Sequence, residues 1–305
     1  KPSGFDSRLY KEAGAEIVNQ KGSIFERAEM ILRVKEPQPS EFDLLRRGQI
    51  LFTYLHLAAS RECTEALLDR GVTAIAYETV QLRDGSLPLL APMSDIAGRL
   101  AIQLGSNLLH RPAGGKGLLL GGLPAAERGR VVILGAGNAG GNAVRLAAAL
   151  GTEVTVFDRK REKLLAMREL GPNVTALYPY AAQVEQSVYQ ADLVVGAVLV
   201  IGARAPHLVS AEQVAGMQPG SVVVDISVDQ GGCIATTHET THENPVYERH
   251  GVIHYAVGNM PGAVPHTSTY ALTNATLPYQ FDVAMHGALG AARLDPSIAH
   301  GLNTV

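Results

Sequence analysis

The chain has 305 residues, enough for two domains of ordinary size, and 46% of them are hydrophobic, enough for a core in each. Its net charge of −3 at pH 7 provides no basic field that would attract nucleic acid or an anionic membrane. The apolar runs are short and broken by glycine, no signal peptide is visible, and Cys63 and Cys233 are isolated. We therefore expect a cytoplasmic protein with no membrane segment and no disulfide framework.

Apolar and amphipathic segments alternate along the first third of the chain. Residues 30–35, 49–55 and 72–78 read as strands, and residues 60–70 read as a helix between the last two. This alternation is typical of a parallel α/β sheet. Residues 92–110 then predict a long helix that links two domains.

A second series of apolar strands follows this helix. Helices are expected between them, at residues 138–150 and 161–170 among others, and the strands are expected at residues 130–134, 153–157, 191–198, 221–226 and 252–256. Such a series fits an open, doubly wound sheet. The final segment, residues 268–302, predicts a helix that returns to the first domain.

The predicted fold class is therefore α/β, with two parallel-sheet domains. Residues 92–269, with the linking helix 92–110, are expected to form a Rossmann domain that binds NAD. Residues 1–91 and 270–305 are expected to form a discontinuous substrate domain, which carries catalytic groups.

A glycine-rich turn joins the strand at 130–134 to the helix that follows it. Gly135 permits the tight bend, Gly137 lets the backbone approach a pyrophosphate, and Gly140 lets helix and strand pack closely. The phosphates would lie on free amides at the helix N-terminus, where Asn138 and Ala139 stand. The turn predicts a dinucleotide site.

Asp158 ends the next strand, 18 residues after Gly140, which is close to the expected acidic position. A carboxylate there accepts both ribose hydroxyls of NAD and repels a 2′-phosphate. Arg159, Lys160 and Arg161 follow at once and can pair with such a phosphate, or they can form an ordinary solvated helix turn. The acidic position favours NAD.

Three polar residues stand at the ends of hydrophobic strands, where parallel sheets place reacting groups. A lysine, Lys35, can polarise a carbonyl oxygen, and His56 titrates near neutral pH and can pass a proton. Asp229 can act as a base or orient an ammonium group. Each also has a structural interpretation, as a surface lysine, a partly buried histidine and a turn residue.

Five sequence blocks resemble the alanine dehydrogenase (alanine dehydrogenase/pyridine nucleotide transhydrogenase) family. They are VKEP at 34–37, GQILFTYLHLA at 48–58, LAPMSDIAGRLA at 90–101, VDISVDQGGC at 224–233 and NMPGAVPHTST at 259–269. The resemblance covers nearly the whole chain. It implies NAD-dependent oxidative deamination of L-alanine to pyruvate and ammonia, the reverse amination, and a homo-hexamer.

The same resemblance implies roles for individual residues. Lys35 holds the substrate oxygen or carboxylate, His56 bonds the carbonyl oxygen and shuttles a proton, and Asp229 assists the water and ammonia steps. Two further residues, Ser94 and Lys163, match positions that touch the cofactor, and the nicotinamide side is lined by Val198, Leu199 and Asn259.

The chain departs from the family pattern in two respects. His266 stands where an arginine is common. Family members begin with a further segment, whose arginine clamps the substrate carboxylate, and continue beyond the last residue, Val305. We therefore expect the 305-residue chain to bind NADH but to deaminate alanine poorly.

Two alternative functions remain open. The run from His238 to His242 satisfies HExxH, the pattern of zinc metallopeptidases. Its threonines and the Asn244-Pro245 pair disfavour the required helix, so we expect a polar surface loop and no metal. The other alternative is a nucleotide-binding subunit of proton-translocating transhydrogenase, which would share the glycine turn.

Overall fold

The computed structural model describes residues 3–199 and 205–305. The chain divides into two compact units. The first comprises Lys1–Met93 and Val264–Val305, and the second comprises Ser94–Ala263. The boundaries thus lie at residues 94 and 264, where the sequence analysis placed them at 92 and 270.

The first unit is built on a four-stranded sheet in the order β1-β2-β3-β11. Three parallel strands are β1 (Met30–Leu32), β2 (Ile50–Thr53) and β3 (Thr73–Ala76), and β11 (Leu302–Thr304) pairs antiparallel with β3. The sheet is therefore mixed, not purely parallel. Phe52 and Ile75, fully buried, lie in its core.

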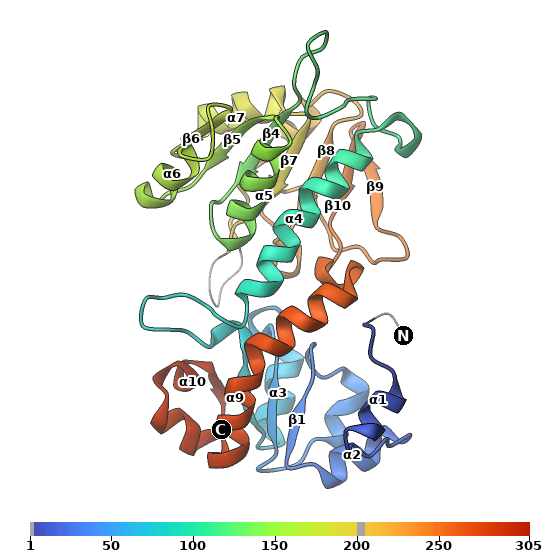
Figure 1. The fold of residues 1–305 in the computed structure, drawn as a ribbon, viewed down its shortest axis with the longest axis vertical. Coiled ribbons are helices and arrows are strands. Elements are labelled where there is room, and N and C mark those ends of the chain that lie inside the picture. Colours follow the sequence, from blue (N-terminus) through green and yellow to red (C-terminus); the bar gives the residue numbers. More distant parts are fainter. Residues whose placement is uncertain (1–2, 200–204) are drawn as a thin grey trace. The chain divides into compact units, whose positions relative to one another are not determined.

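In the described part of this unit, five α-helices and three short 3₁₀ turns accompany the sheet. Figure 1 labels the helices. The helices are α1 (Ser7–Glu12), α2 (Lys21–Arg27), α3 (Arg61–Asp69), α9 (Pro265–Leu294) and α10 (Pro296–Gly301). The turns are η1 (Pro39–Leu44), η2 (Leu57–Ala59) and η3 (Tyr77–Thr79).

The expected single helix over residues 268–302 is wrong. It consists of α9, with a kink at Gly287 (φ 66°, ψ 166°), then α10 and β11. Pro296 begins α10 because its fixed φ suits a first helical position, and the Asp295 side chain caps that helix.

The second unit contains a seven-stranded sheet in the order β6-β5-β4-β7-β8-β10-β9. All its pairs are parallel except that of β10 with the edge strand β9. The strands are β4 (Arg130–Leu134), β5 (Glu153–Phe157), β6 (Val174–Leu177), β7 (Leu193–Gly196), β8 (Val222–Asp225), β9 (Val246–Arg249) and β10 (Val252–Tyr255).

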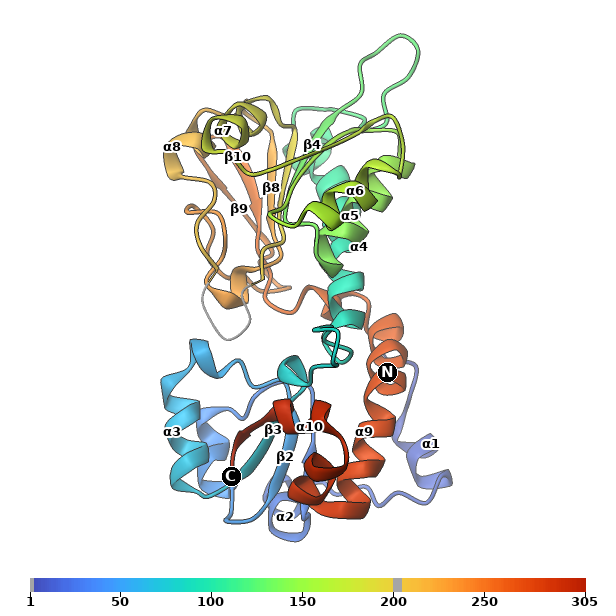
Figure 2. The ribbon, with the colours of Figure 1, turned by 90° about the vertical axis from the view of Figure 1, so that its left-hand side faces the viewer.

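Helices cover both faces of this sheet, as in a doubly wound fold. Figure 2 shows α7 (Ala181–Gln190) and α8 (Ala211–Ala215) on one face, and α4 (Ala91–Leu108) and α5 (Asn138–Ala149) on the other. The connection between β5 and β6 carries α6 (Arg161–Arg168). The expected Rossmann-like sheet is present.

The turn between β4 and α5 depends on two glycines. Gly135 has φ 97°, a value that only glycine adopts without strain, and a Cβ there would lie 2.5 Å from the Ala197 carbonyl oxygen. A Cβ on Gly140 would lie 1.8 Å from the Gly135 carbonyl oxygen. The turn and the first helical turn of α5 can therefore pack this closely only with glycine at both positions.

We expect Gly140→Ala to destabilise the second unit by about 1–3 kcal/mol, because the methyl group displaces the turn. The matched control is Gly141→Ala, whose Cβ would meet nothing closer than Met167 Cε at 3.8 Å. That change should be neutral or stabilising by up to about 1 kcal/mol, since alanine favours helix. Urea unfolding measures both, and equal effects of the two changes would refute this account of the turn.

A buried carboxylate ties the amino-terminal part of the first unit together. Glu41 is 5% exposed and accepts hydrogen bonds from Lys21 Nζ (3.0 Å), Arg33 Nη1 (2.7 Å) and the Gln38 amide (2.8 Å). Burial alone would raise the pKa of Glu41, but these bonds outweigh it and lower the pKa from 4.5 to about 2. The charged carboxylate is therefore stabilising in the folded state.

We expect Glu41→Gln to lower the free energy of unfolding at pH 7 by at most about 3 kcal/mol, the equivalent of this pKa difference. The wild-type advantage is fully present above pH 4.5 and is lost as the pH falls towards 2, where the folded carboxylate is protonated. Urea unfolding at several pH values tests this. Glu12→Gln, in an exposed pair with Arg8, is the control, and a pH-independent difference for Glu41→Gln would contradict the assignment.

Candidate functional site

The carboxyl ends of five neighbouring parallel strands form one edge of the second unit's sheet. Within four residues of these strand ends come the glycine turn (β4), Asp158 (β5), Val198 (β7), Asp229 (β8) and Asn259 (β10). Ligands of open α/β sheets bind at this edge. Val198 Cγ2 would lie 3.5 Å from a Cβ on Gly135, so the loop after β7 lies against the glycine turn.

Asp158 is tied to the glycine turn. Its Oδ2 accepts the Ala136 amide at 2.8 Å, its Oδ1 accepts the Lys160 amide at 2.8 Å, and Lys163 Nζ lies 4.0 Å from Oδ2. Lys163 Nζ would also lie 3.8 Å from a Cβ on Gly137. The carboxylate and the ammonium thus lie at the open side of the turn, where backbone atoms leave space.

Two aspartates four residues apart, Asp225 at the end of β8 and Asp229 in the loop after it, have different roles. Asp225, fully buried, accepts the amides of Ser227 (3.0 Å), Cys233 (3.0 Å) and Ile234 (3.3 Å) and the Thr237 hydroxyl (2.7 Å). Burial raises its pKa, and these donors counteract that effect. Asp225 therefore anchors the loop, a role that the sequence analysis missed.

Asp229 lies in the short 3₁₀ turn η5 (Val228–Gln230) of that loop and is half-buried. Within residues 3–199 and 205–305, no hydrogen bond or ion pair to its carboxylate is recorded. Among the described residues its oxygens have no partner, whereas those of Asp225 are occupied.

The run from His238 to His242 is not a helix, as expected, but an extended loop beside β9. Thr240 forms a parallel bridge with Val257, the His238 ring stacks on Tyr247 with centroids 4.0 Å apart, and His242 Nε2 contacts the Asn259 carbonyl oxygen at 3.1 Å. The two histidines therefore have separate partners. No group of three potential metal-ligating side chains is found in the part of the chain that the structure describes.

In the first unit, Lys35, His56 and Glu78 follow the neighbouring parallel strands β1, β2 and β3. The Lys35 carbonyl oxygen accepts the Thr53 hydroxyl at 3.0 Å, which fixes the Lys35 backbone beside β2. No side-chain partner of Lys35 Nζ or of the His56 ring nitrogens is recorded among the described residues. Glu78, which the sequence analysis missed, accepts hydrogen bonds from the backbone amides of Leu55 and His56.

The predicted catalytic and cofactor-binding residues come from both units. Lys35 and His56 belong to the first unit, while Asp229 and the remaining expected cofactor residues belong to the second. Ser94 lies in the first half of α4, and Leu199 is 45% exposed in the loop after β7. The convergence of all these groups on one ligand stays a prediction.

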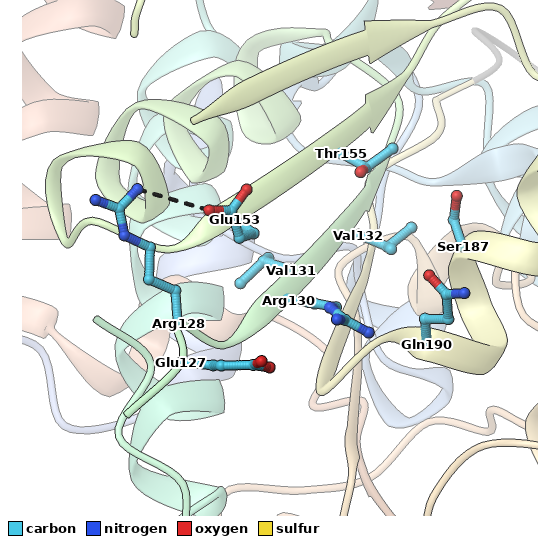
Figure 3. A pocket seen from close by; sticks show the side chains of 9 residues that line it. All are labelled: Glu127, Arg128, Arg130, Val131, Val132, Glu153, Thr155, Ser187 and Gln190. Atoms are coloured by element: carbon cyan, nitrogen blue, oxygen red, sulfur yellow. Dashed lines mark ion pairs between the residues drawn. The ribbon is translucent and has the colours of Figure 1, made fainter. Parts of the chain in front are cut away.

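A cavity of about 460 Å³ lies in the second unit at the amino ends of β4 and β5 (Figure 3). Its charged lining residues are Glu127, Arg128, Arg130 and Glu153, and Arg128 pairs with Glu153 at 3.6 Å. The charges of the two cationic and two anionic side chains cancel. The cavity is therefore at the opposite strand ends from the glycine turn and does not belong to the site described above.

The helices of the described residues include none with the length and apolarity needed to cross a membrane. Two family models match the chain. The model of the alanine dehydrogenase/PNT N-terminal domain matches residues 1–97, and that of the C-terminal domain matches residues 101–305.

Individual relatives agree with these models. The alanine dehydrogenase of Methanococcus maripaludis is 54% identical over 305 residues, which cover 99% of this chain and 82% of that protein. The alanine dehydrogenase of Bacillus subtilis is 49% identical over 304 residues, which cover 99% of this chain and 80% of that protein.

Solved structures extend the comparison. A structure described as L-alanine dehydrogenase matches with a TM-score of 0.90 at 52% identity and covers 99% of this chain and 83% of that one. A transhydrogenase from Sinorhizobium meliloti matches with a TM-score of 0.77 at 24% identity, covers 93% of this chain and 82% of that one, and shares the fold. The chain belongs to the alanine dehydrogenase/PNT family.

Proposed function

We propose that this chain catalyses the NAD-dependent oxidative deamination of L-alanine and the reverse amination. The balanced reaction converts L-alanine, NAD⁺ and water into pyruvate, ammonium, NADH and a proton. One observation carries the assignment: the functional atoms of Lys35, His56 and Asp229 have no recorded protein partner in the described residues, while Glu78 accepts two backbone amides and both oxygens of Asp225 are occupied. Free polar groups at strand ends are what a substrate requires.

The residues of the second unit fit a dinucleotide. A Cβ at Gly137 would have open space around it. The amides of Asn138 and Ala139 belong to the first turn of α5, so they have no acceptor within the helix and can donate to a phosphate. Asp158 keeps lone pairs for ribose hydroxyls, since each of its oxygens accepts one protein amide. Bound NAD would supply a hydride acceptor.

The remaining residues would bind substrate and move protons. Lys35 would bond the alanine carboxylate or the pyruvate oxygen through its ammonium group. His56 would give a proton to the carbonyl oxygen or take one from the corresponding hydroxyl, and Asp229 would take a proton from the water that attacks the imine. Ser94, Lys163, Val198, Leu199 and Asn259 would contact the cofactor.

The assay is NADH formation with a panel of small L-amino acids. Two forms are compared, the 305-residue chain and the same chain extended at its amino end by the family's arginine-bearing segment. The extended form should be more active, because a guanidinium orients a carboxylate better than a single ammonium does. NADH formation with alanine in neither form would refute the proposal, and alanine-independent hydride transfer between nucleotides would favour the transhydrogenase alternative.

We expect His56→Ala and Asp229→Ala each to lower kcat roughly a hundredfold or more, the scale for losing a positioned acid or base. The measurement uses the more active of the two forms. Matched controls are His207→Ala and Asp69→Ala, both exposed, which should leave kcat unchanged. A loss of less than tenfold for both test variants would contradict their catalytic roles.

We expect Asp158→Asn to weaken NADH binding more than NADPH binding, because the change removes the charge that repels a 2′-phosphate. Asparagine keeps one oxygen for the Ala136 amide, so the turn is disturbed less than by alanine. Glu162→Gln, exposed in the first turn of α6, is the control. Fluorescence titration gives both affinities, and an unchanged NADH/NADPH ratio would exclude Asp158 from ribose recognition.

The same resemblance supports three broader proposals. The first unit would be the substrate domain and the second the NAD domain. The protein would assemble as a homo-hexamer and act in the cytoplasm. Sedimentation of the purified protein measures the assembly.

A further inference from the structure

The backbone at His56 adopts a conformation that few residues other than glycine adopt. His56 has φ 49° and ψ 37°, in the left-handed region, three residues after β2 ends. Within the described ranges, only His250 and Asn259 share a positive φ among residues other than glycine. Such a conformation persists where the surroundings hold it.

A single carboxylate holds this turn. Glu78 lies in η3, directly after β3, which pairs in parallel with β2. Its Oε1 accepts the amides of Leu55 at 3.0 Å and His56 at 2.6 Å, and its Oε2 lies 3.3 Å from the Leu55 amide. Bonds from amides to an ionised carboxylate are about twice as strong as neutral ones.

The His56 imidazole makes few contacts with the described residues that would orient it. Its nearest recorded ring contact is Tyr54, with parallel planes (16°) and centroids 6.1 Å apart. Neither ring nitrogen has a recorded hydrogen bond to residues 3–199 or 205–305. The backbone at His56 therefore sets the direction in which its side chain leaves the chain, and the Glu78 carboxylate holds that backbone.

We propose that Glu78 is a positioning residue for His56, whose carboxylate clamps two successive amides and so aims the free imidazole at the substrate. The proposal rests on the function proposed above. It assigns Glu78 no contact with substrate or cofactor and no proton transfer.

Three variants test this with the more active form of the protein. Glu78→Ala removes the acceptor and should lower kcat roughly thirty- to a hundredfold, the scale of misplacing a reacting group by about 1 Å. Glu78→Gln should retain kcat within about threefold, because its single oxygen can still accept both amides. Glu65→Ala, an exposed residue paired with Arg61, is the control and should leave kcat unchanged.

A double-mutant cycle separates positioning from general damage. If Glu78 acts through His56, Glu78→Ala adds nothing to His56→Ala, and the double variant has the kcat of His56→Ala within about twofold. A further loss that multiplies the two single effects would overturn the proposal, as would full activity of Glu78→Ala.

A second readout does not depend on activity with alanine. In protein labelled with ¹⁵N-histidine, the His56 ring signals, assigned with His56→Ala, should shift in Glu78→Ala and stay in place in Glu65→Ala. If wild type makes no NADH from alanine while these signals shift, the proposed function fails and the positioning role stands. If wild type is active and the signals stay in place, the positioning role fails. Should Glu78→Ala not fold, Glu78→Asp, which withdraws the carboxylate by one methylene, takes its place in both measurements.

Discussion

Backbone amides at the carboxyl ends of parallel strands lose their neighbouring strand and need other acceptors. Buried amides without acceptors are costly, and in this chain carboxylates accept them at three strand ends. Glu78 accepts the amides of Leu55 and His56, Asp158 accepts that of Ala136 in the glycine turn, and Asp225 accepts three amides of its own loop. The turn that carries His56, the glycine turn and the loop that carries Asp229 each depend on these bonds.

This use of carboxylates divides the polar residues at the strand ends into two sets. Asp225 has both oxygens occupied by protein donors, and Glu78 gives one oxygen to two successive amides, so these two carboxylates fix the geometry of their turns. Asp229 and His56 lie on the turns so fixed, and the Thr53 hydroxyl holds the carbonyl oxygen of Lys35. All three keep their functional atoms free of recorded partners in the described ranges. A rigid turn with a free terminal group is what preorganised binding requires.

Strands buried on both faces could be predicted from the sequence almost to the residue, as β4 and β5 demonstrate. A short apolar run bounded by turn residues is typical of a buried strand. The edge strands β6, β9 and β11 were missed. They are short and half-exposed, and β9 reads VYER, without an apolar face. The helix prediction over 268–302 failed because periodicity reports apolar spacing but not the kink at Gly287 or the strand after α10.

The candidate site could be predicted only as a set of strand ends. The strand-end positions and the family resemblance predicted His56 and Asp229, but the sequence alone cannot tell which of two aspartates four residues apart gives its oxygens to backbone amides. That depends on where the loop from Asp225 to Thr237 folds back, which Gly231 and Gly232, with φ of 94° and 71°, permit. Glu78 was missed for a related reason, because its partners lie in the turn after the preceding strand, 22 and 23 residues earlier in the chain. Residues that contact ligands can be inferred from their chemistry at a strand end. Residues that position those side chains, such as Glu78, are recognised only from the hydrogen bonds they accept in the structure.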